Sequence, residues 1–345
     1  MKLTAIGIDL AKNVIQVHGV NEQGKAVLRK QLKRAEVSTF FANLEPCLIG
    51  MEACSSAHHW ARKLSQLGHT VKLIAPQFVK PYVKSNKHDA ADAEAVCEAL
   101  TRPTMRFVPV KSADAQAFLA LHRARAGFVK ARTAQANQIR GLLGEFGLVI
   151  PQGIAKLRAQ LPRILEDAEN ALPALLRGLL DRLSQHLQAL DTAVNALEAE
   201  IVAWHRQHAQ SRKLTAIPGI GPLTASALVA SIGDARSFDN ARQLAAWLGL
   251  VPRQHSSGGK PTLLGISKRG DAYLRTLLIH GARAVLNAAT KKANPSNRWL
   301  TQLSMRRHKN IAAVALANKN ARIVWALLKH GRTYSADYMA LRAAA

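Results

Sequence analysis

Two adjacent serines, Ser256 and Ser257, lie in a glycine-rich stretch. A serine hydroxyl attacks phosphate only where neighbouring groups activate it and hold the phosphate. Serine-glycine runs are more often flexible linkers, and the stretch by itself favours a linker. Basic residues around the serines could hold a phosphate: Arg253, Lys260, Lys268, Arg269 and Arg275. What favours a nucleophile over a linker is a second, distant set of residues near the N-terminus, which is typical of a metal-binding carboxylate cluster.

Four acids near the N-terminus form a second set of candidate residues. Asp9 and Glu52 interrupt apolar segments typical of strands, and Asp89 and Asp92 lie three residues apart in a helical segment, so they share one face. An ionised carboxylate beside a core is costly unless it is paired or bound to metal. Carboxylate oxygens suit Mg²⁺, with Mn²⁺ as an alternative, and bound ions can activate an attacking oxygen and stabilise a leaving one.

Each acid also has a structural interpretation. Asp9 could pair with a basic neighbour, Glu52 could cap the following helix, and Asp89 and Asp92 could lie on a solvated helix face. Taken singly, these interpretations are favoured. The joint placement of the four acids in one order of elements favours a metal site instead.

The segments around the acids predict a mixed sheet covered by helices. Three strands joined by short turns are expected at 3–10, 13–20 and 25–32. Helices at 38–44 and 57–67 then alternate with strands at 47–51 and 70–75. An antiparallel meander followed by helix-strand repeats is the order of the ribonuclease H-like fold.

The middle of the chain is predicted to be helical. Residues 113–146 form a long helix with a basic stripe, which would either grip a phosphate backbone or be a solvated face: Arg123, Arg125, Arg132 and Arg140. Prolines at 162 and 173 predict breaks before the next long helix. That helix carries a leucine seam from 176 to 204 in steps of four and three, which predicts a coiled coil. Its partner would be the helix at 113–146 or a second chain.

The C-terminal part is predicted to be a basic helical domain. Pro218, Gly219 and Gly221 form a turn between two apolar segments, typical of a helix-hairpin-helix. Backbone N–H groups at such a turn bind phosphate without reading sequence. The alternative is a purely structural turn. A helix at 241–250 then leads into the serine stretch, and further apolar helices follow it.

Composition narrows the class of partner. The chain has 345 residues, with 48 Lys and Arg against 22 Asp and Glu, and a net charge of +26. Such a surface favours a polyanion, and nucleic acid is the commonest one. Three cysteines without a C-x-x-C pair indicate a reducing compartment, and a zinc site at Cys54, His58 and His59 is disfavoured. We expect a soluble cytoplasmic protein that does not contact a membrane.

Several motifs together resemble one protein family over nearly the whole chain. They are GIDLAK, the ME of IGMEAC, K-x-D-x-x-D, NQIRGLLGEFG, IPGIGPLTA and the block from WLGLVPRQ to GISKRGD-x-x-LR. In this combination and order the sequence is similar to the DEDD transposases of bacterial insertion sequences, in insertion-sequence family one hundred and ten, eleven-eleven subgroup.

The resemblance implies an architecture and a mechanism. It implies a RuvC-like domain at 1–108 with the acids Asp9, Glu52, Asp89 and Asp92, a helical region at 109–210, and a transposase domain at 211–345. It implies a serine nucleophile, Ser257 with Ser256 as the alternative. It also implies a guide RNA from the element, donor and target DNA, and a homo-oligomer, dimer or tetramer, in which the acids of one chain act with the serine of another.

Two rival functions remain. A metal-dependent, junction-resolving nuclease would use the acids and water, with structural serines, and would form no covalent adduct. A non-catalytic nucleic-acid scaffold would depend on neither the acids nor metal. A recombinase is favoured over both.

Overall fold

The computed structural model describes residues 2–84, 86, 88–291 and 298–335. Contacts divide the chain into two compact units, Met1–Gln116 and Ala117–Ala345. The predicted helical middle and C-terminal domain therefore belong to one unit. Lys87 of the K-x-D-x-x-D motif lies outside the described residues.

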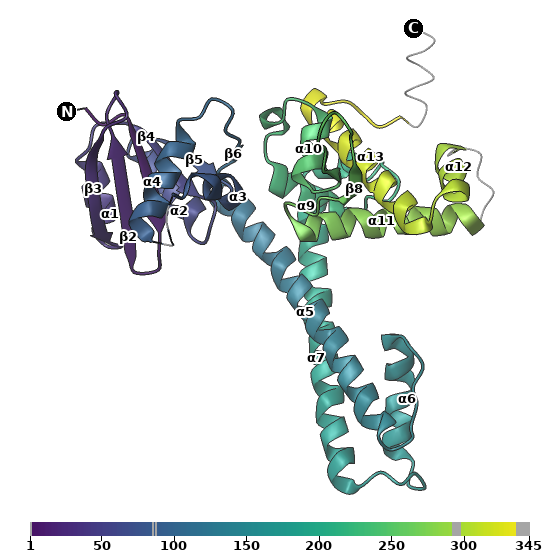
Figure 1. Ribbon diagram of the computed structural model, residues 1–345. Coiled ribbons are helices and arrows are strands. Elements are labelled where there is room, and N and C mark those ends of the chain that lie inside the picture. The colour runs from purple at the N-terminus through teal and green to yellow at the C-terminus, as the bar shows by residue number, and fades with distance from the viewer. Residues whose placement is uncertain (1, 85, 87, 292–297, 336–345) are drawn as a thin grey trace. The chain divides into compact units, whose positions relative to one another are not determined.

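The first unit is built on a six-stranded mixed sheet (Figure 1). Its strands lie in the order β3-β2-β1-β4-β5-β6. β1, β2 and β3 form an antiparallel meander, β4 and β5 run parallel to β1, and β6 is antiparallel to β5. The strands are β1 (Ala5–Leu10), β2 (Val14–Val20), β3 (Ala26–Lys33), β4 (Leu48–Glu52), β5 (Thr70–Ile74) and β6 (Phe107–Val108). The mixed sheet and its five longer strands confirm the prediction; β6 was not predicted.

Helices cover both faces of this sheet because its strands alternate their side chains. One face buries Ile6, Ile8 and Met51 against α1 (Val37–Ala42) and α2 (Ala57–Gln66). The other face packs against α4 (Asp89–Leu100), with Ala5 and Ile74 in that layer. The short helices α3 (Pro76–Val79) and η1 (Lys80–Tyr82) connect β5 to α4.

The second unit begins with long helices that pack on one another. They are α5 (Ala113–Gly144), whose first four residues belong to the first unit, α6 (Ile154–Glu166) and α7 (Ala174–Gln207). Figure 1 shows α5 and α7 running side by side with α6 at one end. Ile139 and Leu143 of α5 share a core with Leu180 and Leu187 of the predicted seam. The seam therefore packs within the chain, and the coiled coil itself stays a prediction.

The remainder of the second unit is helical, with one short hairpin. Its helices are α8 (Ala209–Leu214), α9 (Pro222–Ile232), η2 (Ala235–Ser237), α10 (Ala241–Trp247), α11 (Ala272–Lys291), α12 (Arg298–Arg306) and α13 (Lys309–His330). Strands β7 (Pro252–Gln254) and β8 (Leu263–Ile266) pair antiparallel. One core joins these helices, and buried residues of α13 run along it.

Two local features differ from what composition alone favoured. The serine stretch, which by itself favoured a linker, is the β7–β8 hairpin. Pro162 lies inside α6, which ends at Glu166, and Pro173 directly precedes α7, so the expected interruption before residue 176 is present but does not fall at Pro162. Proline lacks one backbone N–H, and a helix tolerates that loss where packing compensates; Leu157 and Leu161 of α6 are buried.

One described helix, α13, is long and apolar enough by composition to cross a membrane. Of its apolar window, 44% is buried inside the structure. Ala313, Leu316 and Val324 of this helix are part of the core of the second unit. Its composition is therefore explained by packing.

Candidate active site

Two glycines let α4 approach the sheet closely. A Cβ on Gly7 would lie 2.2 Å from Ala93 O and 2.4 Å from Cys97 N, and a Cβ on Gly50 would lie 3.0 Å from Leu100 Cδ2. Side chains two residues apart on a strand face the same way, so Asp9 and Glu52 share the face of Gly7 and Gly50. The strands therefore direct both acids to the side where α4 packs.

The acids from β1 and α4 meet at this face. Carboxylate oxygens of Asp9, Asp89 and Asp92, one from each, lie within 4.8 Å of one another. Asp89 and Asp92 occupy the first turn of α4, and the preceding His88 accepts a hydrogen bond from Ala90 N through Nδ1. The cap fixes where the helix begins and therefore where both acids project.

Glu52 lies beside this group. β1 and β4 pair in parallel with Ile8 opposite Met51, so Asp9 and Glu52 follow at adjacent positions. Burial raises the pKa of Glu52, and the charges of Asp9 and Asp92 raise it further. Glu52 does not cap α2, because Ser56 occupies that position. The structure thus brings Asp9, Asp89 and Asp92 together and places Glu52 beside them.

A divalent cation fits this donor set. Carboxylate oxygens of Asp9, Asp89 and Asp92 lie within 4.8 Å of one another, and burial and then the charges of Asp9 and Asp92 raise the pKa of Glu52. Negative charges this close repel one another, and a bound cation removes that repulsion. Cys54 lies near the acids, which was not predicted from the sequence. Burial raises the pKa of its thiol, and the charges of Glu52 and Asp9 raise it further. The signal in the sequence was its position two residues after Glu52 in IGMEAC.

The serines lie at the tip of the β7–β8 hairpin. Ser257 and Lys260 form a bridge in which Lys260 N donates to Ser257 O at 3.0 Å. Gly258 and Gly259 between them have φ of +54° and +76°, the pattern of a type I′ turn. Ser256 Oγ accepts a hydrogen bond of 2.9 Å from Gln254 Nε2. Both serines are exposed, and Ser257 lies directly at the turn.

The predicted basic residues of this region fall into two groups. Arg253, Lys260, Lys268 and Arg269 are exposed on or beside the hairpin. Arg275 is instead half-buried on α11, and its Nη1 donates to Leu248 O at 3.1 Å and to Arg269 O at 3.2 Å. The exposed four are accessible to a phosphate backbone.

The basic stripe of α5 is mostly engaged within the unit. Arg125 Nε donates to Glu198 Oε1 at 2.8 Å, and Arg132 Nη1 donates to Asp191 Oδ1 at 3.1 Å. The two arginines are seven residues apart on α5, and their acidic partners are seven residues apart in the reverse direction on α7, as expected for two antiparallel helices. Arg158 of α6 also pairs with Asp191. These contacts stabilise the helix pair, so any phosphate contact by Arg125 or Arg132 stays a prediction.

Arg123 and Arg140 have fewer intramolecular partners. Arg123 is exposed on α5. Arg140 Nη1 donates to Asn137 Oδ1 at 3.1 Å, while its Nε and Nη2 are buried and make no hydrogen bond to any residue that the structure describes. Arg123 is accessible to a phosphate backbone, whereas the unpaired nitrogens of Arg140 are buried, like Nε of Arg132. A phosphate contact by Arg140 therefore stays a prediction.

The turn at 218–221 is fixed against α11 and α13. Gly219 has φ of +86°, and a Cβ there would lie 2.8 Å from Gly281 O. The buried Asn320 donates from Nδ2 to Pro218 O at 2.9 Å. Gly221 precedes α9 and is exposed, with open space at its Cβ position. The backbone at Gly221 is therefore the accessible part of the predicted phosphate-binding turn.

A buried polar network in the second unit was not predicted. The fully buried His122 of α5 is hydrogen bonded through Nδ1 to Tyr273 Oη at 3.0 Å and through Nε2 to Ser226 Oγ at 3.2 Å. Burial, with a smaller effect of Arg125, lowers the pKa of His122 to about 4. The network joins α5 to α9 and α11. Its members lie far apart in sequence, so no local pattern indicates it.

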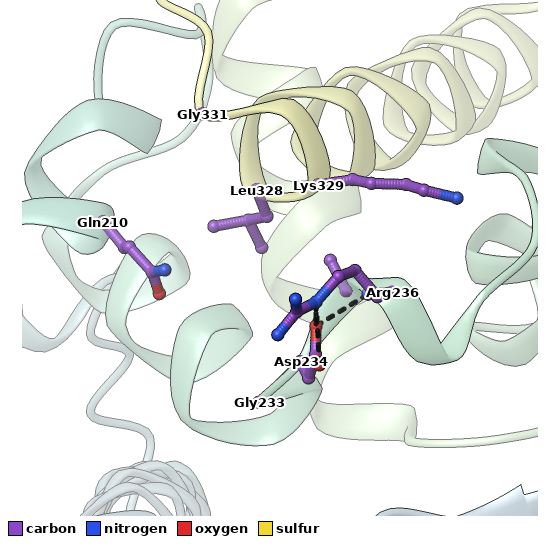
Figure 2. A pocket seen from close by; sticks show the side chains of 8 residues that line it. Gln210, Gly233, Asp234, Arg236, Leu328, Lys329 and Gly331 are labelled. Carbon is purple, nitrogen blue, oxygen red and sulfur yellow. Dashed lines mark hydrogen bonds and ion pairs between the residues drawn. The ribbon is translucent and has the colours of Figure 1, made fainter.

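An open hollow of about 510 Å³ lies elsewhere in the second unit, at the ends of α9 and α13. Figure 2 shows the ion pair of Asp234 and Arg236 on its wall. Arg236 Nε donates a hydrogen bond to Asp234 Oδ1 at 3.0 Å. No predicted catalytic or binding residue lines it. The acid cluster and the hairpin therefore remain the candidate sites.

Comparisons with known proteins match both ends of the chain. The family model DEDD_Tnp_IS110, described as "Transposase", matches residues 6–147. The model described as "Transposase IS116/IS110/IS902 family" matches residues 211–296. The first match includes all four acids, and the second includes the serine hairpin.

Curated relatives are similar over nearly their whole lengths. A Pseudomonas aeruginosa protein described as "Probable family 20 transposase" is 57% identical over 335 residues, 97% of this chain and 99% of the relative. The "Transposase for insertion sequence element IS1111A" of Coxiella burnetii is 46% identical, with 95% and 90% covered. The "Transposase for insertion sequence element IS1328" of Yersinia enterocolitica is 44% identical, with 96% and 99% covered.

These matches agree with the mixed sheet and with the acid cluster in it. A DEDD transposase domain implies a ribonuclease H-like fold and the use of a divalent metal. The subgroup expected from the sequence is consistent with the IS1111A and IS1328 relatives. The chain therefore belongs to the IS110/IS116 family of insertion-sequence transposases, enzymes that act on DNA.

Proposed function

We propose that this transposase cuts and rejoins DNA through a covalent phosphoserine intermediate that depends on Mg²⁺, or alternatively Mn²⁺. Ser257 Oγ attacks a DNA phosphodiester, a bond forms between Oγ and phosphorus, and one bond from phosphorus to a sugar oxygen breaks. The serine proton passes to solvent or a base, and the sugar leaves as a hydroxyl. Attack by a sugar hydroxyl of another strand on the phosphoserine reverses these steps and rejoins the DNA.

The observation that carries the proposal is the convergence of Asp9, Asp89 and Asp92 within 4.8 Å, with Glu52 beside them. These four side chains would hold the metal. When bound, the metal would stabilise negative charge on the phosphate and on the leaving oxygen. Because Gly7 and Gly50 have no side chain, α4 packs closely on the sheet, and the acids of α4 therefore lie near those of the strands.

The position of Ser257 supports its role as the nucleophile. It lies at an exposed turn, where an oxygen can reach a phosphodiester in a bulky duplex. Ser256 Oγ is engaged by Gln254, which makes Ser256 the weaker candidate. The exposed Arg253, Lys260, Lys268 and Arg269 would bind the flanking phosphates.

The partners proposed for the reaction are donor and target DNA, a guide RNA from the element, and further copies of this chain. The net charge of +26 supports polyanionic partners. Arg123 and Arg140 on α5, and the accessible backbone at Gly221, would contribute contacts to phosphate that do not read sequence. In the proposed homo-oligomer, the acids of one chain act with Ser257 of another.

A hydrolytic, junction-resolving nuclease is the second candidate. It is favoured by one observation, that all four acids belong to the unit Met1–Gln116 and need no residue from elsewhere to bind metal. In that case water would replace Ser257, and the hairpin would serve only to bind DNA. The two candidates differ in whether a covalent protein-DNA adduct forms.

A covalent-trapping experiment distinguishes them. Purified protein, Mg²⁺, the flanking noncoding RNA of the element and end-labelled donor DNA are resolved on a denaturing gel. Phosphoserine chemistry predicts label at protein size for the wild type and Ser256→Ala, and none for Ser257→Ala or Asp9→Ala. Cleaved DNA without any shifted label indicates the nuclease instead.

A further inference from the structure

Among the residues that the structure describes, the serine hairpin is anchored at its base. Every residue from Pro252 to Gly265 is exposed, and two-stranded hairpins are marginally stable in water without packing. The direction of Ser257 must therefore be set where the two ends of the hairpin join the helical core. This makes the base the part of the molecule that decides where the serine points.

At the base the two ends of the hairpin touch through their backbones. Gly249 has φ of +69°, and a Cβ there would lie 2.0 Å from Arg269 O. Gly270 has φ of +81°, and a Cβ there would lie 1.8 Å from Trp247 O. Lys268 N donates to Gly249 O at 3.1 Å, and between this bond and the strand pair of Pro252 with Ile266, Ser267 N donates to Val251 O at 2.8 Å. Both glycines are required for this contact.

Arg275 bonds to both ends at once. Its Nη1 donates to Leu248 O, just before the hairpin, and to Arg269 O, just after it. The same Nη1 lies 2.9 Å from the position that a Cβ on Gly249 would take, so the guanidinium fills the space left by the glycine. Asn318 on α13 adds a third contact, because its Nδ2 donates to Leu250 O at 3.1 Å.

We propose that Arg275 is a positioning residue that fixes the direction of the serine hairpin, and that it is not a phosphate ligand. The inference rests on the proposed role of Ser257. A phosphate ligand needs its charge, and lysine can replace it as a point charge. The clamp needs a donor nitrogen at the position of Nη1, which donates to both carbonyl oxygens. The lysine ammonium lies one atom nearer the backbone than Nη1 and is a point charge without the planar guanidinium geometry. Arg275→Lys therefore separates the two roles, because it keeps the charge and withdraws the nitrogen that contacts both ends.

The test uses the full-length protein with Arg275→Lys and Arg275→Gln, and Arg242→Lys as the control. Arg242 is exposed on α10, away from the hairpin sequence. DNA affinity is measured in a Ser257→Ala background, and the single-turnover rate of adduct formation is measured at saturating DNA with Ser257 intact. Positioning predicts that Arg275→Lys lowers the rate tenfold or more, like Arg275→Gln, while Kd changes less than twofold.

Amide hydrogen exchange tests the clamp without any chemistry. Arg275→Lys should speed exchange at Ser267 and Lys268, whose amides donate to Val251 O and Gly249 O, and leave α9 unchanged. Protection in α9 also confirms that the variant is folded. Asn318→Ala, which removes one base contact and leaves Arg275 in place, should raise exchange at the same amides to a smaller extent.

Other outcomes overturn the inference. If Arg275→Gln weakens DNA binding, Arg275→Lys retains it, and neither changes the adduct rate at saturating DNA, Arg275 is a phosphate ligand. Unchanged exchange at Ser267 and Lys268 in Arg275→Lys also rejects the clamp. If the wild type forms no adduct, the proposed role of Ser257 fails, and exchange alone then decides whether Arg275 holds the hairpin base.

Discussion

Gly7 of β1 and Cys97 of α4 are in backbone contact, and a Cβ on Gly7 would lie 2.4 Å from Cys97 N and 2.8 Å from Cys97 Cβ. This contact lies two residues from Asp9 on β1 and one and a half helical turns from Asp92 on α4. It therefore sets the distance between the acids of the strand and the acids of the helix.

Gly7→Ala should push α4 away from the sheet. The expected cost is about 1–3 kcal/mol of unfolding free energy, typical of an overpacked core, together with weaker metal binding at the acids. Denaturant unfolding and Mn²⁺ titration measure the two effects. Gly141→Ala on α5, where a Cβ meets open space, is the control and should stabilise the protein slightly. Unchanged stability and metal affinity in Gly7→Ala would contradict this account of the contact.

Glu52→Gln should stabilise the protein in EDTA. The pKa of Glu52 is raised, so its contribution to stability is present below the ordinary glutamate pKa and is lost as pH rises through the raised value. At neutral pH the substitution removes a repelled charge, and Tm should rise on the order of 2 °C. Mg²⁺ should then raise the Tm of the wild type and not of Glu52→Gln. Glu22→Gln, at an exposed position, is the control and should leave Tm unchanged. A lower Tm for Glu52→Gln in EDTA would contradict the repulsion between Glu52 and the acids Asp9 and Asp92.

Acid should destabilise the second unit through His122. Its pKa is lowered to about 4 by burial, so the unfolded chain takes up this proton first as pH falls. Stability is therefore fully present above the ordinary histidine pKa and decreases on the order of 3 kcal/mol from pH 7 to pH 4. Denaturant unfolding followed by tryptophan fluorescence reports this, because four of the five tryptophans lie in the second unit.

His122→Gln keeps hydrogen-bonding groups and removes the titration, so its stability should depend less steeply on pH over the same range. The exposed His280→Gln should retain the wild-type dependence. An equally steep loss in His122→Gln would assign the acid sensitivity to other groups.

The turn at Gly258 should tolerate asparagine and not valine. Its φ of +54° is accessible to glycine and asparagine and is strained for a β-branched residue, by about 1–2 kcal/mol. Gly258→Val should lower the rate of adduct formation fivefold or more, and Gly258→Asn should retain most of it. Gly265→Ala, with open space at its Cβ position, is the control in β8. Equal rates for Gly258→Val and the wild type would show that the turn does not position Ser257.

The first unit was predictable because its signals are local and regular. A short apolar run defines β1, alternating apolar residues define β2, and a helical segment carries Asp89 and Asp92 on one face. The order of these elements then determines which strand ends meet. The contact of Gly7 with α4 was not predictable, because a glycine inside a strand does not say which element approaches it.

The serine hairpin illustrates why composition misleads. Glycine and serine are typical of linkers, yet Gly258-Gly259 is also a type I′ turn signal. The flanking strands lack alternating apolar residues because neither face is buried, so the usual strand pattern is absent. Their pairing depends instead on the fixed base, where Arg275 and Asn318 come from distant helices.

The basic stripe of α5 shows a limit of reading one helix at a time. Arg125 and Arg132 face Glu198 and Asp191, which are also seven residues apart on α7. This matched spacing was present in the sequence, but it has meaning only once α5 and α7 are known to run antiparallel. Which acid pairs with which arginine therefore depends on how the two helices are aligned, and the basic stripe of α5 alone does not predict it.

The central claim is that Ser257 becomes covalently bound to DNA, and peptide mapping of the trapped adduct tests it most directly. Adduct formed with Mg²⁺ is digested with trypsin and a nuclease, and mass spectrometry locates the residual nucleotide. The account predicts the nucleotide on Ser257 in the peptide that begins at Gln254, and its loss in Asp9→Ala. Cleaved DNA with no modified peptide, or a nucleotide on a residue outside the hairpin, would contradict the account.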